Sequence, residues 1–100
     1  MKDICEKVSD MIIKRHKGFV SEIGKPGLID FIDYFIQEHN IDKKKCSCDA
    51  LYKIINDQYW FSVDYRNNIQ IIIADKKSFV QTFIIDLSQP ERQLAMPFLC

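Results

Sequence analysis

Residues 58–87 read QYWFSVDYRNNIQIIIADKKSFVQTFIIDL, a stretch in which apolar side chains recur at every second position. A period of two is typical of β-strands, because successive side chains point to opposite faces of a sheet. The pattern predicts three strands, over residues 59–65, 69–74 and 79–87. Short connections between them predict an antiparallel meander.

The pairing of the first two strands can be argued from the rule that opposed residues share a face. A two-residue turn at 67–68 would mix the faces, whereas a three-residue loop over 66–68 keeps them separate. That loop aligns Tyr65 with Ile69, Val63 with Ile71 and Phe61 with Ile73. The expected core face carries Tyr59 and Ile69, and continues in the third strand through Phe79, Gln81, Phe83, Ile85 and Leu87.

The first half of the chain follows a helical period instead. Apolar residues spaced by three and four predict one helix over residues 3–17 and a second that begins at Leu28. Residues 19–27, with two glycines and Pro26, are expected to be a connector. Ser47 is placed to cap a third, shorter helix that ends near residue 56.

The end of the chain is expected to turn after Leu87. Pro90 suits the first position of a short C-terminal helix or tail that runs to Met96 and stops at Pro97. The sequence therefore predicts a single α+β domain over residues 1–100, with three N-terminal helices, a three-stranded antiparallel meander and this C-terminal helix or tail.

The length and charge of the chain argue against some classes of function. The chain has 100 residues, and its 14 Lys and Arg balance its 14 Asp and Glu, which argues against a partner bound mainly through phosphates. No export signal and no run of roughly 20 apolar residues is present, so we expect a cytoplasmic protein with no membrane partner. We interpret the four cysteines, Cys5, Cys46, Cys48 and Cys100, as free thiols.

Cys46 and Cys48, with His39 upstream, are the one grouping that resembles a metal site or an activated thiol. Zinc sites usually separate paired cysteines by two to four residues, and here one residue intervenes. Three lysines before Cys46 would suit a thiolate, but no third group is placed to orient a base. The glycine spacing matches no phosphate loop. We therefore predict no metal, no cofactor and no catalytic residue.

Two surfaces are candidates for binding another protein. The sheet face opposite the core is too apolar for a solvated surface, and its candidate contact residues are Trp60, Ile72, Val80 and Ile84. A competing interpretation is that the C-terminal segment covers this face through Leu94, Met96, Phe98 and Leu99. The second surface lies on the second helix, where a basic partner could meet Asp30, Asp33, Tyr34 and Glu38.

These features lead to the hypothesis of a small non-enzymatic protein-binding module. Within that class, we expect a cytoplasmic inhibitor of the immunity-protein or antitoxin type, which neutralises a toxin or nuclease; this is an analogy of class. The alternative is a winged-helix-like nucleic-acid-binding protein with a strand at Phe19–Val20, a recognition helix over 47–56 and a wing tip at 66–68. Lys43, Lys44, Lys45 and Lys53 would then contact phosphates.

Overall fold

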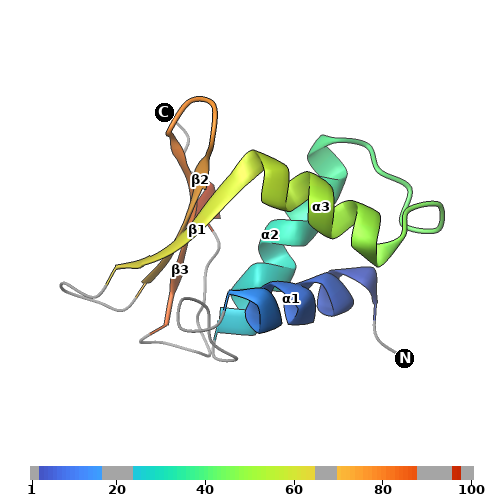
Figure 1. The fold of residues 1–100 in the computed structure, drawn as a ribbon, viewed down its shortest axis with the longest axis horizontal. Coiled ribbons are helices and arrows are strands. Elements are labelled where there is room, and N and C mark those ends of the chain that lie inside the picture. Colours follow the sequence, from blue (N-terminus) through green and yellow to red (C-terminus); the bar gives the residue numbers. More distant parts are fainter. Residues whose placement is uncertain (1–2, 17–23, 65–69, 88–95, 98–100) are drawn as a thin grey trace.

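Three helices come first along the chain and an antiparallel sheet follows, in a computed structural model that describes residues 3–16, 24–64, 70–87 and 96–97. The helices are α1 (Ile4–Arg15), α2 (Lys25–Glu38) and α3 (Cys48–Gln58). The strands are β1 (Tyr59–Asp64), β2 (Gln70–Asp75), β3 (Gln81–Asp86) and β4 (Met96–Pro97). All three helices lie on one side of the sheet (Figure 1). The predicted α+β class is confirmed.

Polar side chains set the starts of two helices. The Ile4 amide donates to the Asp3 carboxylate at 2.7 Å, and the Ala50 amide donates to Ser47 Oγ at 3.1 Å. Each bond satisfies a backbone N–H that has no partner inside its helix. The predicted cap at Ser47 is therefore confirmed.

The second helix begins earlier than predicted, at Lys25, and includes residues that were assigned to a connector. Pro26 fits in the first turn, where its missing N–H costs no hydrogen bond. Gly27 is buried against β3, and a Cβ at this position would lie 2.5 Å from Ile85 Cγ2. Here close helix–sheet packing requires the glycine.

The end of α2 uses a left-handed residue. Asn40 has a φ of 51°, its amide donates to Gln37 O at 3.3 Å, and the Ile41 amide donates to Ile36 O at 3.0 Å. This is the Schellman pattern, which satisfies the last carbonyls of a helix. The chain turns there toward α3.

The predicted register of the meander is confirmed where it is described. Phe61 pairs with Ile73 and Val63 pairs with Ile71. The expected pair of Tyr65 with Ile69 and the loop over 66–68 lie outside the described residues. The strand order is β1-β2-β3-β4, with every neighbouring pair antiparallel.

The third strand begins two residues later than predicted, at Gln81. Ile73 pairs with Phe83 but Ala74 pairs with Gln81, so Thr82 is the extra residue of a β-bulge. The bulge moves Gln81 to the exposed face, and Phe79 lies in the turn before the strand. The prediction that both residues face the core was wrong.

The short C-terminal helix or tail predicted to run to Met96 is described only at its last residue, which lies in a strand and not in a helix. Met96 and Pro97 form β4, pairing with Ile84 and Phe83 along the edge of β3. Proline is accepted on an edge strand, where a missing donor does not break a ladder. The sheet therefore has a fourth strand, and residues 88–95 and 98–100, including Leu94, lie outside the described residues.

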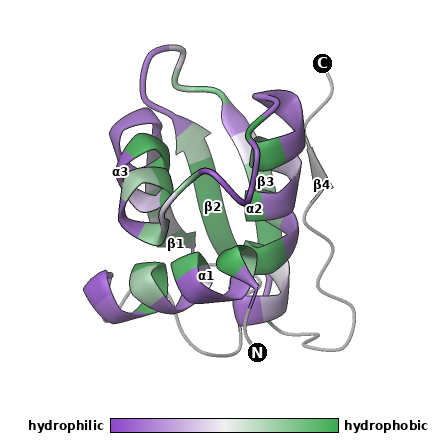
Figure 2. Ribbon diagram, turned by 90° about the vertical axis from the view of Figure 1, so that its right-hand side faces the viewer, coloured by the Kyte–Doolittle hydropathy of each residue, from purple (hydrophilic) through white to green (hydrophobic). Residues whose placement is uncertain are grey.

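The core fills the space between the helices and the inner sheet face. Phe31 lies at its centre, with its ring centroid 5.1 Å from those of Tyr59 and Phe83 in edge-on contacts. β2 is hydrophobic along most of its length and lies behind the helices in Figure 2. Other fully buried side chains are Val8, Ile12, Leu28, Ile32, Phe35, Leu51, Ile55, Ile71, Ile73 and Ile85.

Candidate functional site

The turn between β2 and β3 is built around Asp75. Its Oδ1 accepts hydrogen bonds from the amides of Lys77 at 2.8 Å and Ser78 at 3.1 Å. Its carbonyl accepts from the Phe79 amide at 2.9 Å, and its own amide donates to Val80 O at 2.9 Å. The bonds from the Ser78 and Lys77 amides lower the pKa of Asp75, so its carboxylate stays charged in this turn.

Phe79 occupies an unusual conformation at the end of this turn. Its φ is 59°, in the left-handed region, and 70% of its surface is exposed. An L-residue other than glycine is strained there by roughly 1–2 kcal/mol, because Cβ crowds the following carbonyl. A bulky aromatic in this conformation is an outlier, and it presents its ring to solvent.

Trp60 comes from β1 and lies beside Phe79. It pairs with the small Ala74, and since its neighbours Tyr59 and Phe61 are buried against the helices, Trp60 lies on the opposite face of the sheet. Its ring centroid is 5.2 Å from that of Phe79, with a tilt of 42°. Trp60 is 46% exposed and Val80, next in sequence to Phe79, is 44% exposed. We call Trp60, Phe79 and Val80 the hairpin-end surface.

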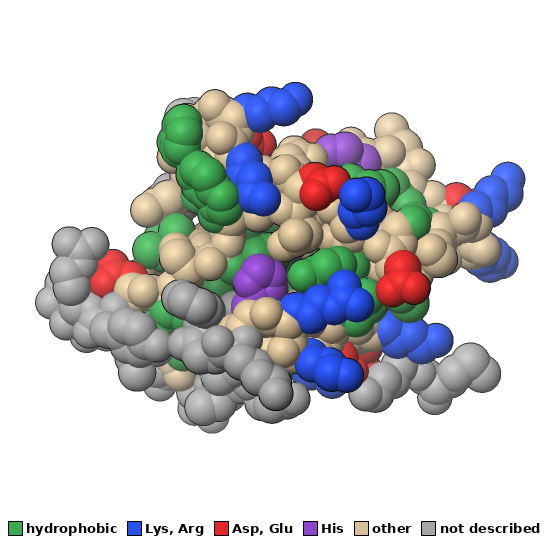
Figure 3. Space-filling view, in the orientation of Figure 1, with side chains coloured by type: hydrophobic (Ala, Val, Ile, Leu, Met, Phe, Trp, Pro, Cys, Tyr) green, Lys and Arg blue, Asp and Glu red, His purple; other side chains and the backbone are tan. Residues whose placement is uncertain are grey.

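Figure 3 shows hydrophobic side chains gathered where the β2–β3 turn lies in Figure 1, with basic side chains beside them. A hollow of about 390 Å³ is lined by Ile54, Asp57 and Gln58 from α3 and by Lys77 from the turn. Ile54 is itself 44% exposed. Apolar surface is therefore present on α3 as well as on the sheet at this end of the molecule.

Hydrogen bonds hold the turn against the end of α3. The Lys76 amide donates to Gln58 O at 2.8 Å, and Lys76 Nζ donates to Asn56 O at 2.7 Å. The backbone of the turn is thus fixed both by Asp75 and by α3. A turn held by hydrogen bonds in this way would lower the entropic cost of any binding through Phe79.

The four predicted residues of the outer sheet face fall into two groups. Ile72 and Ile84 are half-buried and pair directly with each other in the middle of the face. Trp60 and Val80 are exposed near the hairpin end. Sequence reasoning missed Phe79, which joins them. The available signal was Asp75 followed by Ser78, a spacing typical of a turn closed by an aspartate side chain.

The predicted acidic surface of α2 is partly neutralised. Asp33 lies 3.4 Å from Lys43 Nζ and also accepts from Gln37 at 2.8 Å. Tyr34 is half-buried, with its ring centroid 4.9 Å from that of Phe83. Asp30 and Glu38 are exposed by surface area. Partial loss of hydration at Asp30 and the nearby Asp33 charge raise the pKa of Asp30. Two of the four predicted residues therefore remain as exposed carboxylates.

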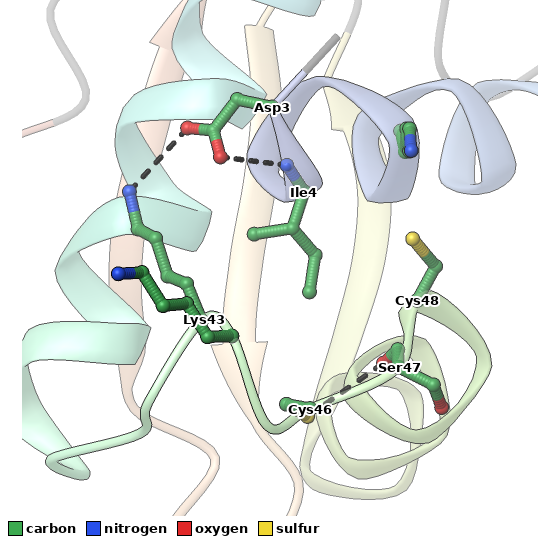
Figure 4. A pocket seen from close by; sticks show the side chains of 8 residues that line it. Asp3, Ile4, Lys43, Cys46, Ser47 and Cys48 are labelled. Carbon is green, nitrogen blue, oxygen red and sulfur yellow. Dashed lines mark hydrogen bonds and ion pairs between the residues drawn. The ribbon is translucent and has the colours of Figure 1, made fainter.

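Cys46 and Cys48 line a separate hollow of about 470 Å³ at the start of α3 (Figure 4). The Cys48 thiol points toward α1, whereas Cys46 Sγ donates to Ser47 O at 3.6 Å. His39 stacks on Phe35 and does not line this hollow. Within residues 3–16, 24–64, 70–87 and 96–97, no three metal-binding side chains converge.

The lysines required by the winged-helix alternative are partly engaged. Lys43 lies 3.4 Å from carboxylate oxygens of both Asp3 and Asp33, and Lys53 lies 3.8 Å from Asp57. The strand expected at Phe19–Val20 and the wing tip at 66–68 lie outside the described residues.

Across the part of the chain that the structure describes, no helix has the length and hydropathy needed to cross a membrane. Comparisons with protein-family models, with curated proteins and with solved structures found no match to this chain.

Proposed function

We propose that this chain is a non-enzymatic protein-binding module and that its partner binds the hairpin-end surface. The observation that carries this proposal is Phe79, an aromatic side chain that is 70% exposed and held at a φ of 59°. Burying that ring and Trp60 against a partner would remove apolar area from water, which favours association. Aromatic anchors of this kind commonly dominate binding energy.

Within this class, we propose an inhibitor that neutralises a protein such as a toxin or nuclease by covering part of its surface. Immunity proteins and antitoxins act in this way, and the likeness is one of class. A small domain with a packed core and a rigid, exposed aromatic pair suits such a task. Binding alone would account for inhibition, and no chemistry by this chain is required.

The experiment is a capture of partners in the native host with three tagged forms of the chain. These are the wild type, the double variant Trp60→Ser/Phe79→Ser, and the control Glu38→Ser on the acidic surface of α2. We expect a single stoichiometric protein with the wild type and the control, and its loss with the double variant. Circular dichroism checks that each variant is folded; neither ring is part of the buried core, with Phe79 70% and Trp60 46% exposed.

Other outcomes would redirect the proposal. A partner retained by the double variant but lost with Glu38→Ser would contradict the hairpin-end surface and favour α2. Loss of all bound material on nuclease treatment would favour the nucleic-acid alternative. We place that alternative second because Lys43 and Lys53, two of its four lysines, already face carboxylates.

A further inference from the structure

Two adjacent lysines, Lys76 and Lys77, lie in the β2–β3 turn, three and two residues before Phe79. Lys76 Nζ donates to the carbonyl oxygen of Asn56 at 2.7 Å, a neutral partner that leaves the lysine charge uncompensated. Lys77 is exposed and lines the hollow beside Ile54. Among the described residues, neither ammonium has a carboxylate oxygen within 4.0 Å. The turn that leads to Phe79 therefore carries two lysine charges, of which Lys77 is the exposed one.

The carboxylates of the same region are already engaged. The Asp75 side chain accepts from the amides of Lys77 and Ser78 inside the turn. Asp57, which lines the hollow, lies 3.8 Å from Lys53 Nζ. Asp75 keeps its negative charge, because the amides that donate to it are neutral, so Lys76, Lys77 and Asp75 together leave one positive charge in the turn, although the whole chain is neutral.

Building on the proposed function, we infer that the partner presents an apolar protein segment flanked by carboxylates to the hairpin-end surface. Its apolar side chains pack on Trp60 and Phe79, and its Asp or Glu side chains pair with the exposed Lys77. Complementary charge at the rim of an interface sets specificity and speeds association. The inferred partner segment is acidic, in contrast to the basic partner expected from the α2 surface.

The small number of cations favours a protein over other anionic partners. A nucleic acid is held by neutralising several phosphates, each with its own Lys or Arg. The hairpin end supplies two such side chains beside an apolar cluster. An acidic and apolar peptide matches both features with a few side chains.

The first experiment is a selection from a random peptide library displayed on phage. Peptides are selected on the folded wild-type chain and counter-selected on Trp60→Ser/Phe79→Ser. We expect the retained sequences to combine large apolar residues with an excess of Asp and Glu over Lys and Arg. A neutral or basic set of retained sequences would overturn the inference.

The second experiment titrates the best selected peptide that lacks tryptophan. Trp60 is the single tryptophan of the chain, so its fluorescence reports directly on the site. We expect Lys77→Glu to weaken binding about three- to tenfold at low salt, and less at high salt. The matched control Lys45→Glu, in the exposed loop before α3, should leave the affinity unchanged.

Failure of this inference can be told apart from failure of the proposed function. Peptides that depend on Trp60 and Phe79 but ignore Lys77→Glu would overturn the charge preference and leave the binding surface standing. No peptide that distinguishes the wild type from the double variant would contradict the surface itself. Salt-dependent binding of a single-stranded thymidine oligonucleotide, lost in Lys77→Glu, would overturn the protein partner in favour of nucleic acid.

Discussion

The strain at Phe79 can be measured with a pair of substitutions that differ by one methyl group. Phe79→Ala removes the ring but keeps the Cβ that is crowded at a φ of 59°. Phe79→Gly removes both. The difference in unfolding free energy between the two variants therefore isolates the backbone strain from the contact with Trp60.

The expected values follow from the geometry. Relief of a left-handed conformation contributes about 1–2 kcal/mol, and the extra freedom of glycine in the unfolded chain costs about 0.5–1 kcal/mol. The two ranges together give a difference of about 0–1.5 kcal/mol, so Phe79→Gly should be more stable than Phe79→Ala by about 0.8 kcal/mol. The Trp60 contact lies at an exposed site, so Phe79→Ala should lose at most about 1 kcal/mol relative to the wild type.

Urea unfolding followed by far-ultraviolet circular dichroism is the suitable assay, because tryptophan emission would respond to residue 79 directly. Ser62 provides the control: it is exposed in β1 and lies outside the left-handed region. There the order should reverse, with Ser62→Ala more stable than Ser62→Gly. If Phe79→Ala is more stable than Phe79→Gly, the backbone at residue 79 is not strained. The argument that Phe79 costs stability and serves a function then fails.

Three further predictions concern packing, capping and pH. Gly27→Ala should lower stability by about 1–2 kcal/mol in urea unfolding, because the new Cβ would lie 2.5 Å from Ile85 Cγ2 and overpacking outweighs the gain in helix propensity. Ser47→Ala should cost about 1 kcal/mol by the same assay, since the Ala50 amide loses its acceptor; an unchanged midpoint would show that water replaces this cap. Burial lowers the pKa of His16 below its usual 6.5, so the unfolded chain binds a proton before the folded chain does. Stability should therefore fall as the pH drops through this value, and His16→Gln should flatten that slope in unfolding curves taken at several pH values.

The pairing of β1 with β2 could be predicted because a slip of one residue would turn one strand over relative to the other. With β2 in place, Phe61 would leave the core while Ile73 stayed in it, and Ser62 would enter the core. A pattern with one buried face therefore has a single acceptable register. The helix cap at Ser47 was predictable for a similar reason, since a hydroxyl before a helix has a defined local partner.

The start of α2 could not be predicted from local preference. Pro26 and Gly27 both disfavour a helix interior, yet the first turn accepts the proline and contact with Ile85 requires the glycine. That requirement comes from a strand almost sixty positions later in the sequence. The pairing of β4 with β3 is likewise a long-range contact, which an isolated Met–Pro pair does not indicate.

The predicted start of β3 was wrong because the alternation of apolar residues in this strand looks unbroken in the sequence. Apolar residues stand at both 79 and 80, so either could begin the inward face. The bulge at Thr82 adds one residue to the strand and changes which side chains point inward before it. When the residues of both strand faces are apolar, an alternating pattern does not reveal an inserted residue.

The contrast between Asn40 and Phe79 connects the wrongly predicted start of β3 with the proposed function. Both residues have positive φ, at 51° and 59°. At the end of α2 the chain uses asparagine, a residue that tolerates this conformation and suits a helix terminus.

At the β2–β3 turn the chain instead uses a phenylalanine, which gains little burial there. A residue that strains the backbone and exposes a ring beside Trp60 serves the fold poorly at that position. Departures from local preference of this kind are expected at functional sites, and this is the reason for our proposal that Phe79 contacts a partner.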